Sequence, residues 1–149
     1  MRTYVPTAEW IMLDWHRACV VAEVLCVQRC TSCGRWRHPP RRFCPSCLSD
    51  RATFEPVVGD GSVSSFVVSH RSLDPGWHAQ APYATLVVEL DEGPRVLAAT
   101  TIPPADIRIG QRVAVRIDAT SDSFVLVWAE PRPASDDIIN AINERRPHE

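Results

Sequence analysis

Two pairs of cysteines have the spacing of a metal site. Cys30 and Cys33 form one CxxC turn, Cys44 and Cys47 form a second, and ten residues separate the two turns. Each such turn points both of its sulfurs at one centre, and two turns supply the tetrahedral four-thiolate shell that zinc prefers. Because four protein ligands leave no open coordination position, the pattern predicts a structural zinc ion rather than a catalytic one.

Two other interpretations of the cysteines fit less well. A thioredoxin-like dithiol occurs as a single pair within a βαβ unit, whereas this chain has two pairs. A nucleoside deaminase requires an H-x-E motif besides its cysteine pair, and neither His16 nor His38 begins one. The remaining thiols, Cys19 and Cys26, are interpreted as apolar packing residues.

Arginines and aromatic residues surround the cysteine pairs. Between residues 29 and 51 there is a single acid, Asp50, and the aromatic residues Trp36 and Phe43 are interleaved. The arginines of this stretch are Arg29, Arg35, Arg37, Arg41, Arg42 and Arg51. Such a surface suits nucleic-acid phosphates and bases. It suits equally the phosphates and adenine of a nucleotide cofactor such as coenzyme A. A solvated basic face without a ligand is the third interpretation.

Another group of polar residues, His70, Asp74 and His78, lies in one expected loop. A His–Asp pair can act in acid–base catalysis. However, the chain lacks a G-x-S-x-G nucleophile motif and a glycine-rich phosphate loop. An ordinary polar loop between strands is therefore favoured, and we expect no catalytic residue on this chain.

The segment before the cysteines has the pattern of a helix over residues 7–23. Ile11, Trp15, Ala18 and Ala22 fall on one helical stripe, and further apolar side chains lie on the other sides. A helix of this kind needs burial on more than one side. It packs either on its own domain or into a partner protein, and the sequence leaves both alternatives open.

The segment after the cysteines alternates between apolar and polar side chains in the manner of strands. The expected strands are at residues 62–70, 83–90, 95–100, 112–118 and 122–130. Five short strands without long helices between them predict a small barrel. An OB-fold is the first choice, and an SH3-like barrel is the second.

We therefore expect a mainly β protein in four parts. They are an N-terminal helical segment at residues 1–23, a rubredoxin-like zinc ribbon at 24–51, the five-stranded barrel at 52–130 and a tail at 131–149. Within the tail, Ser135, Asp136 and Asp137 can cap a short C-terminal helix that runs through Asn143.

Composition narrows the possible partners. A net charge of -2 over 149 residues argues against a general polyanion binder. The chain has no run of about 18 uncharged apolar residues, so no membrane span is expected. Its first residues lack the order of a signal peptide, which predicts a cytoplasmic protein with reduced thiols. All 16 basic residues are arginines, which excludes Schiff-base chemistry through a lysine and is typical of a high-GC genome.

These motifs occur in an order that resembles a known family. In the ribbon they are QRCTSCG at residues 28–34, HPPR at 38–41 and CPSC at 44–47. In the barrel they are GDGSV at 59–63, APY at 81–83, VELDEG at 88–93 and IGQRV at 109–113. The chain resembles, over roughly residues 8–130, the zinc-ribbon plus OB-fold proteins that accompany thiolase-superfamily enzymes, a family long catalogued as a domain of unknown function.

The resemblance implies a non-catalytic subunit in a hetero-oligomer with a thiolase-like enzyme that acts on acyl-CoA thioesters. Actinobacterial members resemble companions of a thiolase-type retro-aldolase that removes a steroid side chain, and the arginine-only composition favours this case. On this view Trp10 and Trp15 anchor the partner, because tryptophan dominates interface hot spots.

The same view assigns ligand contacts within the ribbon. Arg35, Trp36, Arg37 and Arg41 are the candidates for contacts to the phosphates or adenine of coenzyme A. A single-stranded nucleic-acid binder is the alternative function, because OB-folds and zinc ribbons both bind nucleic acids. The expected barrel faces are mainly aliphatic and acids offset their few arginines, so nucleic acid is not the expected partner.

Overall fold

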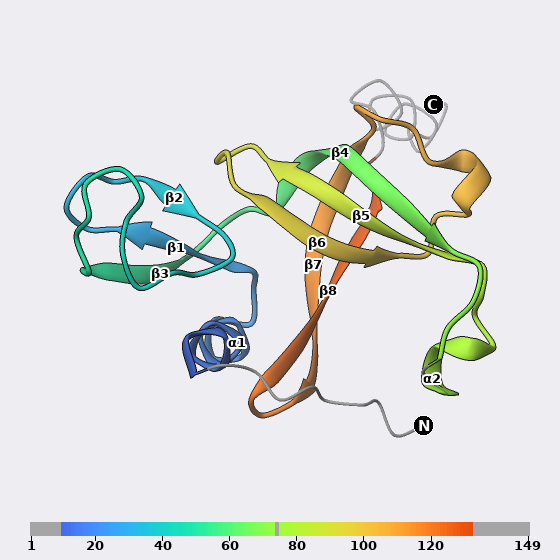
Figure 1. The fold of residues 1–149 in the computed structure, drawn as a ribbon, viewed down its shortest axis with the longest axis horizontal. Helices are drawn as coiled ribbons and strands as arrows, with labels where there is room; N and C mark the ends of the chain where they lie inside the picture. The colour runs from blue at the N-terminus through green and yellow to red at the C-terminus, as the bar shows by residue number, and fades with distance from the viewer. Residues whose placement is uncertain (1–9, 74, 133–149) are drawn as a thin grey trace, which may run out of the picture.

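The N-terminal part of the described chain is a helix followed by a small sheet (Figure 1). The computed structural model describes residues 10–73 and 75–132, and the side chain of Trp10 lies outside that description. The elements here are α1 (Trp10–Ala22), β1 (Cys26–Cys30), β2 (Trp36–Arg37) and β3 (Ala52–Pro56). The strands form an antiparallel sheet in the order β2-β1-β3. Because β3 pairs with β1, the ribbon sheet extends through Pro56, past the expected boundary at residue 51.

The C-terminal half is a closed five-stranded barrel. Its strands are β4 (Asp60–Ser69), β5 (Tyr83–Leu90), β6 (Arg95–Thr100), β7 (Arg112–Ser121) and β8 (Phe124–Pro131). They follow the order β4-β5-β6-β8-β7, and β7 pairs back onto β4. A short α2 (Pro75–His78) links β4 to β5, and η1 (Pro104–Asp106) lies between β6 and β7. This is an OB-like barrel, which confirms the first choice from the sequence over the SH3-like alternative.

Strand β5 illustrates how the sequence specifies the barrel. Ala84, Leu86, Val88 and Leu90 are buried, whereas the residues between them are half-buried or exposed. Because successive side chains of a strand point to opposite faces, this alternation turns one apolar face into the barrel. The apolar core then continues from the barrel into the ribbon and the helix, where it includes Val27.

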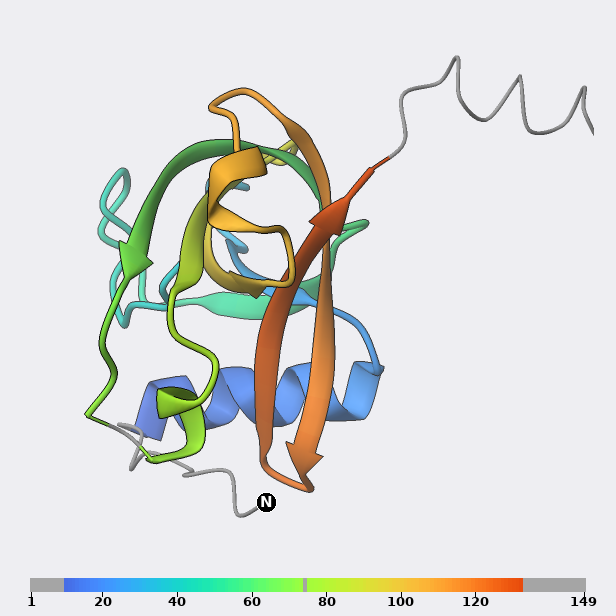
Figure 2. The same ribbon diagram turned by 90° about the vertical axis from the view of Figure 1, so that its right-hand side faces the viewer.

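Helix α1 packs on its own chain, beside the β7–β8 hairpin (Figure 2). Trp15 and Cys19 are buried at 3% and 0% exposure. The His16 ring stacks on Phe124 of β8 at 4.0 Å between centroids. The first alternative from the sequence therefore holds for this side of the helix. Trp15, a candidate anchor for a partner, belongs to the core of the chain itself, so its side chain is not presented to a partner in this structure.

The outer side of α1 is exposed to solvent, since Val21 is 85% exposed.

The expected helix from Ser135 to Asn143 lies outside the described residues. Among the helices that the structure does describe, none is both long enough and apolar enough to cross a membrane.

Candidate functional site

The four predicted ligands come together at the end of the ribbon sheet. The sulfurs of Cys30 and Cys47 are 3.6 Å apart, and those of Cys33 and Cys44 are 3.5 Å apart. All four sulfurs lie within 4.8 Å of one another. A tetrahedral ion with metal–sulfur bonds of about 2.3 Å has sulfurs about 3.8 Å apart, so the cluster fits a single four-thiolate metal site. Cys19 and Cys26 lie outside it, buried between α1 and β1, which confirms their interpretation as packing thiols.

Two similar backbone turns present these sulfurs. In the first turn, Gly34 N–H donates to the Cys30 carbonyl at 2.8 Å. In the second turn, Leu48 N–H donates to the Cys44 carbonyl at 2.9 Å. Both residues that close the turns have positive φ, +74° for Gly34 and +59° for Leu48. A hydrogen bond of 2.8 Å between the hydroxyls of Ser32 and Ser49 ties the two turns together.

Backbone N–H groups stabilise the thiolate form of two of the sulfurs, Cys30 and Cys44. The N–H groups of Cys33 and Ser32 face the Cys30 sulfur and lower its pKa to about 6. In the second turn, the N–H groups of Ser46 and Cys47 lower the pKa of Cys44 in the same way. Because the thiolate is the metal-binding form of cysteine, these N–H groups favour the state of Cys30 and Cys44 that a cation requires.

A buried polar contact holds the loop between the two turns. Gln28 of β1 accepts hydrogen bonds at its side-chain oxygen from Arg37 Nε at 2.6 Å and from the Arg41 N–H at 2.8 Å. Arg37 Nη2 also donates to the Arg41 carbonyl at 3.2 Å. Arg37 is only 6% exposed, so of the four coenzyme A candidates it is the least accessible to a ligand. Arg37 instead links β2 to β1 and to the loop at Arg41 inside the ribbon.

A cleft of about 590 Å³ separates the ribbon from the barrel. It is lined by Cys33, Gly34, Arg35, Trp36, Glu92, Gly93 and Pro94, which come from the ribbon and from the β5–β6 hairpin. The structure therefore brings Arg35 and Trp36 into one cleft, whereas Arg37 and Arg41 do not line it. The Arg29 guanidinium lies 4.9 Å from the Trp36 ring centroid and bonds to Glu55 at 3.1 Å, which fixes the indole in place.

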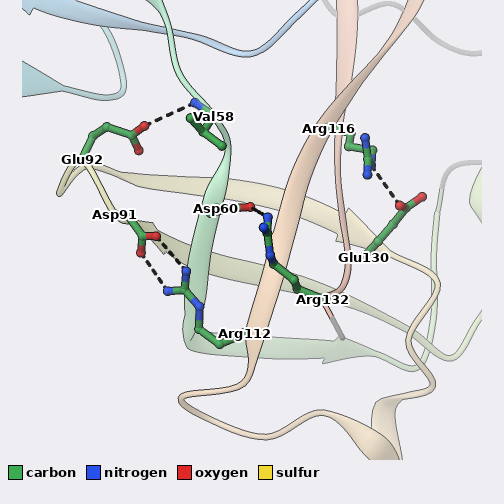
Figure 3. A network of polar contacts seen from close by, with 8 residues as sticks. All are labelled: Val58, Asp60, Asp91, Glu92, Arg112, Arg116, Glu130 and Arg132. Atoms are coloured by element: carbon green, nitrogen blue, oxygen red, sulfur yellow. Dashed lines mark hydrogen bonds and ion pairs between the residues drawn. The ribbon is translucent and has the colours of Figure 1, made fainter. Parts of the chain in front are cut away.

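Glu92 is the residue of this cleft that sequence reasoning missed. One of its carboxylate oxygens accepts a hydrogen bond from the Val58 N–H at 3.3 Å (Figure 3). The other oxygen is buried and has no hydrogen-bond partner among the described residues. The turn at residues 91–93 was recognisable in the sequence, but nothing local indicated that it faces the ribbon. A buried acceptor without a hydrogen-bond partner is rare in folded proteins, which distinguishes Glu92 from the other residues of the cleft.

The arginines of the ribbon loops and the barrel differ in their partners. Four barrel arginines have carboxylate partners: Arg95 with Glu89, Arg112 with Asp91, Arg116 with Glu130 and Arg132 with Asp60. The last three pairs are shown in Figure 3. Five ribbon arginines form no ion pair within the described part of the chain: the buried Arg37 and the exposed Arg35, Arg41, Arg42 and Arg51. Uncompensated positive charge is therefore concentrated around the metal site, where an anionic ligand or partner surface would gain most.

The two histidines of the loop at residues 70–78 both lie at the surface. His78 is exposed, and its Nδ1 lies 3.1 Å from the Ser72 carbonyl. His70 is exposed at the end of β4, and Asp74 lies outside the described residues. The exposure of both histidines agrees with the interpretation as an ordinary surface loop.

Two models of one protein family match the chain in the order expected from its motifs. The rubredoxin-like zinc ribbon domain of ChsH2 matches residues 22–54, and the C-terminal OB-fold domain of ChsH2 matches residues 54–118. The chain belongs to the ChsH2/DUF35 family. The resemblance drawn from the sequence is thereby confirmed, as is the combination of zinc ribbon and OB-fold.

Relatives of this ChsH2/DUF35 chain include enzyme subunits and scaffold proteins. It is 38% identical over 111 residues to a probable enoyl-CoA hydratase alpha subunit of Thermomonospora curvata, covering 73% of this chain and 30% of the relative. It is 33% identical to the 3-oxo-4,17-pregnadiene-20-carboxyl-CoA hydratase alpha subunit of Mycobacterium tuberculosis, covering 73% and 34%. The chain thus spans about a third of the length of these hydratase subunits.

Two further relatives match over most of their own length. A DUF35 domain-containing scaffold protein of Methanocaldococcus jannaschii is 32% identical over 106 residues, which cover 67% of this chain and 74% of the relative. The solved structure of an Ltp2-ChsH2(DUF35) aldolase superimposes with a TM-score of 0.74 at 30% identity. That match covers 85% of this chain and 98% of the matched chain in that structure.

Proposed function

We propose that this chain is a non-catalytic accessory subunit that binds a thiolase-like aldolase and helps to enclose the acyl-CoA substrate of that enzyme. The observation that carries the proposal is the match to the solved Ltp2-ChsH2(DUF35) aldolase structure, which covers 98% of the matched chain. The archaeal scaffold relative supports an accessory rather than a catalytic role. The pregnadiene-carboxyl-CoA hydratase relative supports a steroid-derived acyl-CoA as the substrate class.

The metal of the proposed subunit is zinc. Four thiolates favour zinc among the common divalent cations of proteins, and four protein ligands leave the ion without an open position for catalysis. The zinc ion would hold the two cysteine turns together. Because Arg35 and Trp36 follow the first turn directly, the ion would also hold the ribbon side of the cleft in place.

The cleft offers three contacts that suit coenzyme A. Arg35 is exposed and without a carboxylate partner in the described structure, so its guanidinium can bind a phosphate. The braced ring of Trp36 offers a flat surface for adenine. Glu92 lines the barrel side of the cleft, and its unpartnered oxygen, buried in this structure, can accept an N–H from the adenine amine or from a pantetheine amide once the side chain turns into the cleft.

Kinetics of the reconstituted complex test this proposal. The chain is combined with a thiolase-like aldolase of the same organism, and acyl-CoA cleavage is followed with wild type, Arg35→Ala and the control Arg71→Ala. Arg71 is exposed on the loop after β4 and does not line the cleft. We expect Arg35→Ala to raise KM for the acyl-CoA about ten-fold, because one charge-assisted contact is lost. Equal KM values for the two variants would contradict the role of the cleft, and failure to form a complex would contradict the subunit role.

A further inference from the structure

The two cysteine turns differ at the residue that closes each of them. Both closing residues have left-handed backbone conformations, but the first is Gly34 and the second is Leu48. Glycine adopts this conformation freely, whereas a side chain with a Cβ is strained in it. The second turn therefore carries a strained residue at a position where the first turn shows that glycine is sufficient.

Packing within the chain does not offset this strain. The Leu48 side chain is 76% exposed, so it buries little apolar surface in the chain itself. Strained backbone conformations persist where the surroundings or a function require them, and they concentrate at binding sites. The leucine therefore points to a contact with something outside the chain.

Leu48 has an exposed aromatic neighbour on the same turn. Phe43 precedes Cys44 and is 54% exposed. The Cys44 N–H donates to the Ser49 carbonyl at 2.9 Å, which joins the two ends of the turn. The Arg42 guanidinium lies 5.4 Å from the Phe43 ring centroid. We refer to Arg42, Phe43 and Leu48 as the knuckle surface.

The charges around the knuckle surface are mainly positive. Arg41, Arg42 and Arg51 are exposed and form no ion pair within the described residues, and Asp50 is the single acid between them. An apolar pair bordered by free cations is complementary to an apolar pocket with carboxylates at its rim.

We propose that Phe43 and Leu48 insert into an apolar, acid-rimmed pocket of a partner protein, and that this partner is the thiolase-like subunit. The identity of the partner rests on the proposed function above. A protein is favoured over a nucleic acid because an aliphatic side chain has no ring on which a base could stack, whereas it gains by burial in an apolar pocket. The knuckle surface is distinct from the cleft, since none of its residues lines the cleft.

Two substitutions of Leu48 separate docking from a structural role. Leu48→Gly removes both the strain and the apolar contact, and Leu48→Asn keeps a side chain that tolerates the left-handed conformation. We expect both variants to retain one zinc per chain, and the glycine variant to unfold at a higher denaturant concentration than wild type. In contrast, affinity for the thiolase-like subunit should fall about ten-fold or more in both, measured by calorimetry. If Leu48 served only to stabilise the fold, Leu48→Gly would unfold at a lower denaturant concentration than wild type. The affinity for the thiolase-like subunit would then be unchanged.

Two further variants test the specificity of the contact. Leu73→Gly removes a second exposed leucine, on the loop before α2, and should leave affinity unchanged. Arg42→Glu should weaken binding, with a smaller loss at high salt, because screening reduces the repulsion from a carboxylate rim.

The outcomes distinguish this inference from the proposed function. If wild type forms no complex with the thiolase-like subunit, both are wrong. If wild type binds and the Leu48 variants bind equally well, the proposed function stands and the knuckle contact is wrong. A labelled single-stranded oligonucleotide that binds wild type but not Leu48→Gly would make a nucleic acid the occupant, which also overturns the inference.

Discussion

The indole nitrogen of Trp15 donates a hydrogen bond of 2.7 Å to the carbonyl of Cys26, and this contact joins α1 to the first strand of the ribbon. A second contact nearby, from the Cys26 N–H to the Cys19 sulfur at 3.3 Å, joins the same two elements. The Trp15 ring also lies between His16 and His38, with ring centroids 4.7 Å and 4.9 Å away. The helix is therefore built into the core of the chain.

Substitutions of Trp15 test how much this junction contributes. Trp15→Ala should lower the free energy of unfolding by about 3–5 kcal/mol, because it leaves a cavity in a buried site. Trp15→Phe should cost less, since it retains much of the ring but leaves the Cys26 carbonyl with only the long contact from the Cys19 thiol at 4.0 Å. Urea unfolding measures both. Val21→Ala on the exposed side of the helix is the control, expected within about 0.5 kcal/mol of wild type. Similar losses at the two positions would show that the helix is not docked.

Removal of the metal should unfold the ribbon. Apparent binding free energies of structural zinc are about 10–16 kcal/mol in small modules, so a chelator or Cys44→Ser should abolish the order of the two turns. The measurements are zinc content and protease resistance of the segment between the turns. Cys19→Ala is the matched control, because this cysteine is not a ligand and the variant should keep one zinc per chain. Full zinc content in Cys44→Ser would contradict the assignment of the ligands.

His38 should make the protein less stable in mild acid. Burial lowers the pKa of His38 from 6.5 to about 4, with a smaller contribution from His16. Between these two values the unfolded chain binds a proton that the folded chain does not. The free energy of unfolding should therefore fall as the pH drops from about 6.5 to about 4, by about 3 kcal/mol in total.

The variant His38→Gln isolates this effect. Other groups, including the ligand thiols and His16, whose pKa is also lowered by burial, titrate in both proteins. The quantity of interest is thus the difference between the two stability profiles, obtained by urea unfolding at several pH values. We expect the wild-type profile to be steeper below pH 6.5. Parallel profiles would show that His38 is already protonated in the folded state or is exposed to solvent.

The pair of Arg112 and Asp91 should matter much less to stability. The Arg112 guanidinium donates two hydrogen bonds of 2.7 Å to the Asp91 carboxylate and lowers the pKa of Asp91, but both side chains are exposed (Figure 3). Exposed ion pairs contribute little because water and salt screen them. Arg112→Ala should shift the melting temperature slightly at low salt and not at 1 M salt, while the pKa of Asp91 measured by NMR rises. A drop in melting temperature for Arg112→Ala as large as the drop measured for Trp15→Ala would contradict the small contribution of this ion pair.

The cysteine cluster and the barrel were predictable from local patterns in the sequence. Each CxxC turn is a local structure, so its spacing alone sets the direction of its sulfurs, and the ordered motifs indicated the family. Alternating side chains in segments such as residues 83–90 likewise reflect the local geometry of a strand.

The neighbours of these elements became known from the three-dimensional fold alone. It placed Trp15 inside the chain, joined residues 52–56 to the ribbon sheet, and brought Glu92 opposite Arg35 and Trp36 across one cleft. It also showed that Leu48 takes a left-handed conformation with its side chain exposed. Contacts of this kind depend on strand register and on packing between distant segments, and local spacing carries no information about either.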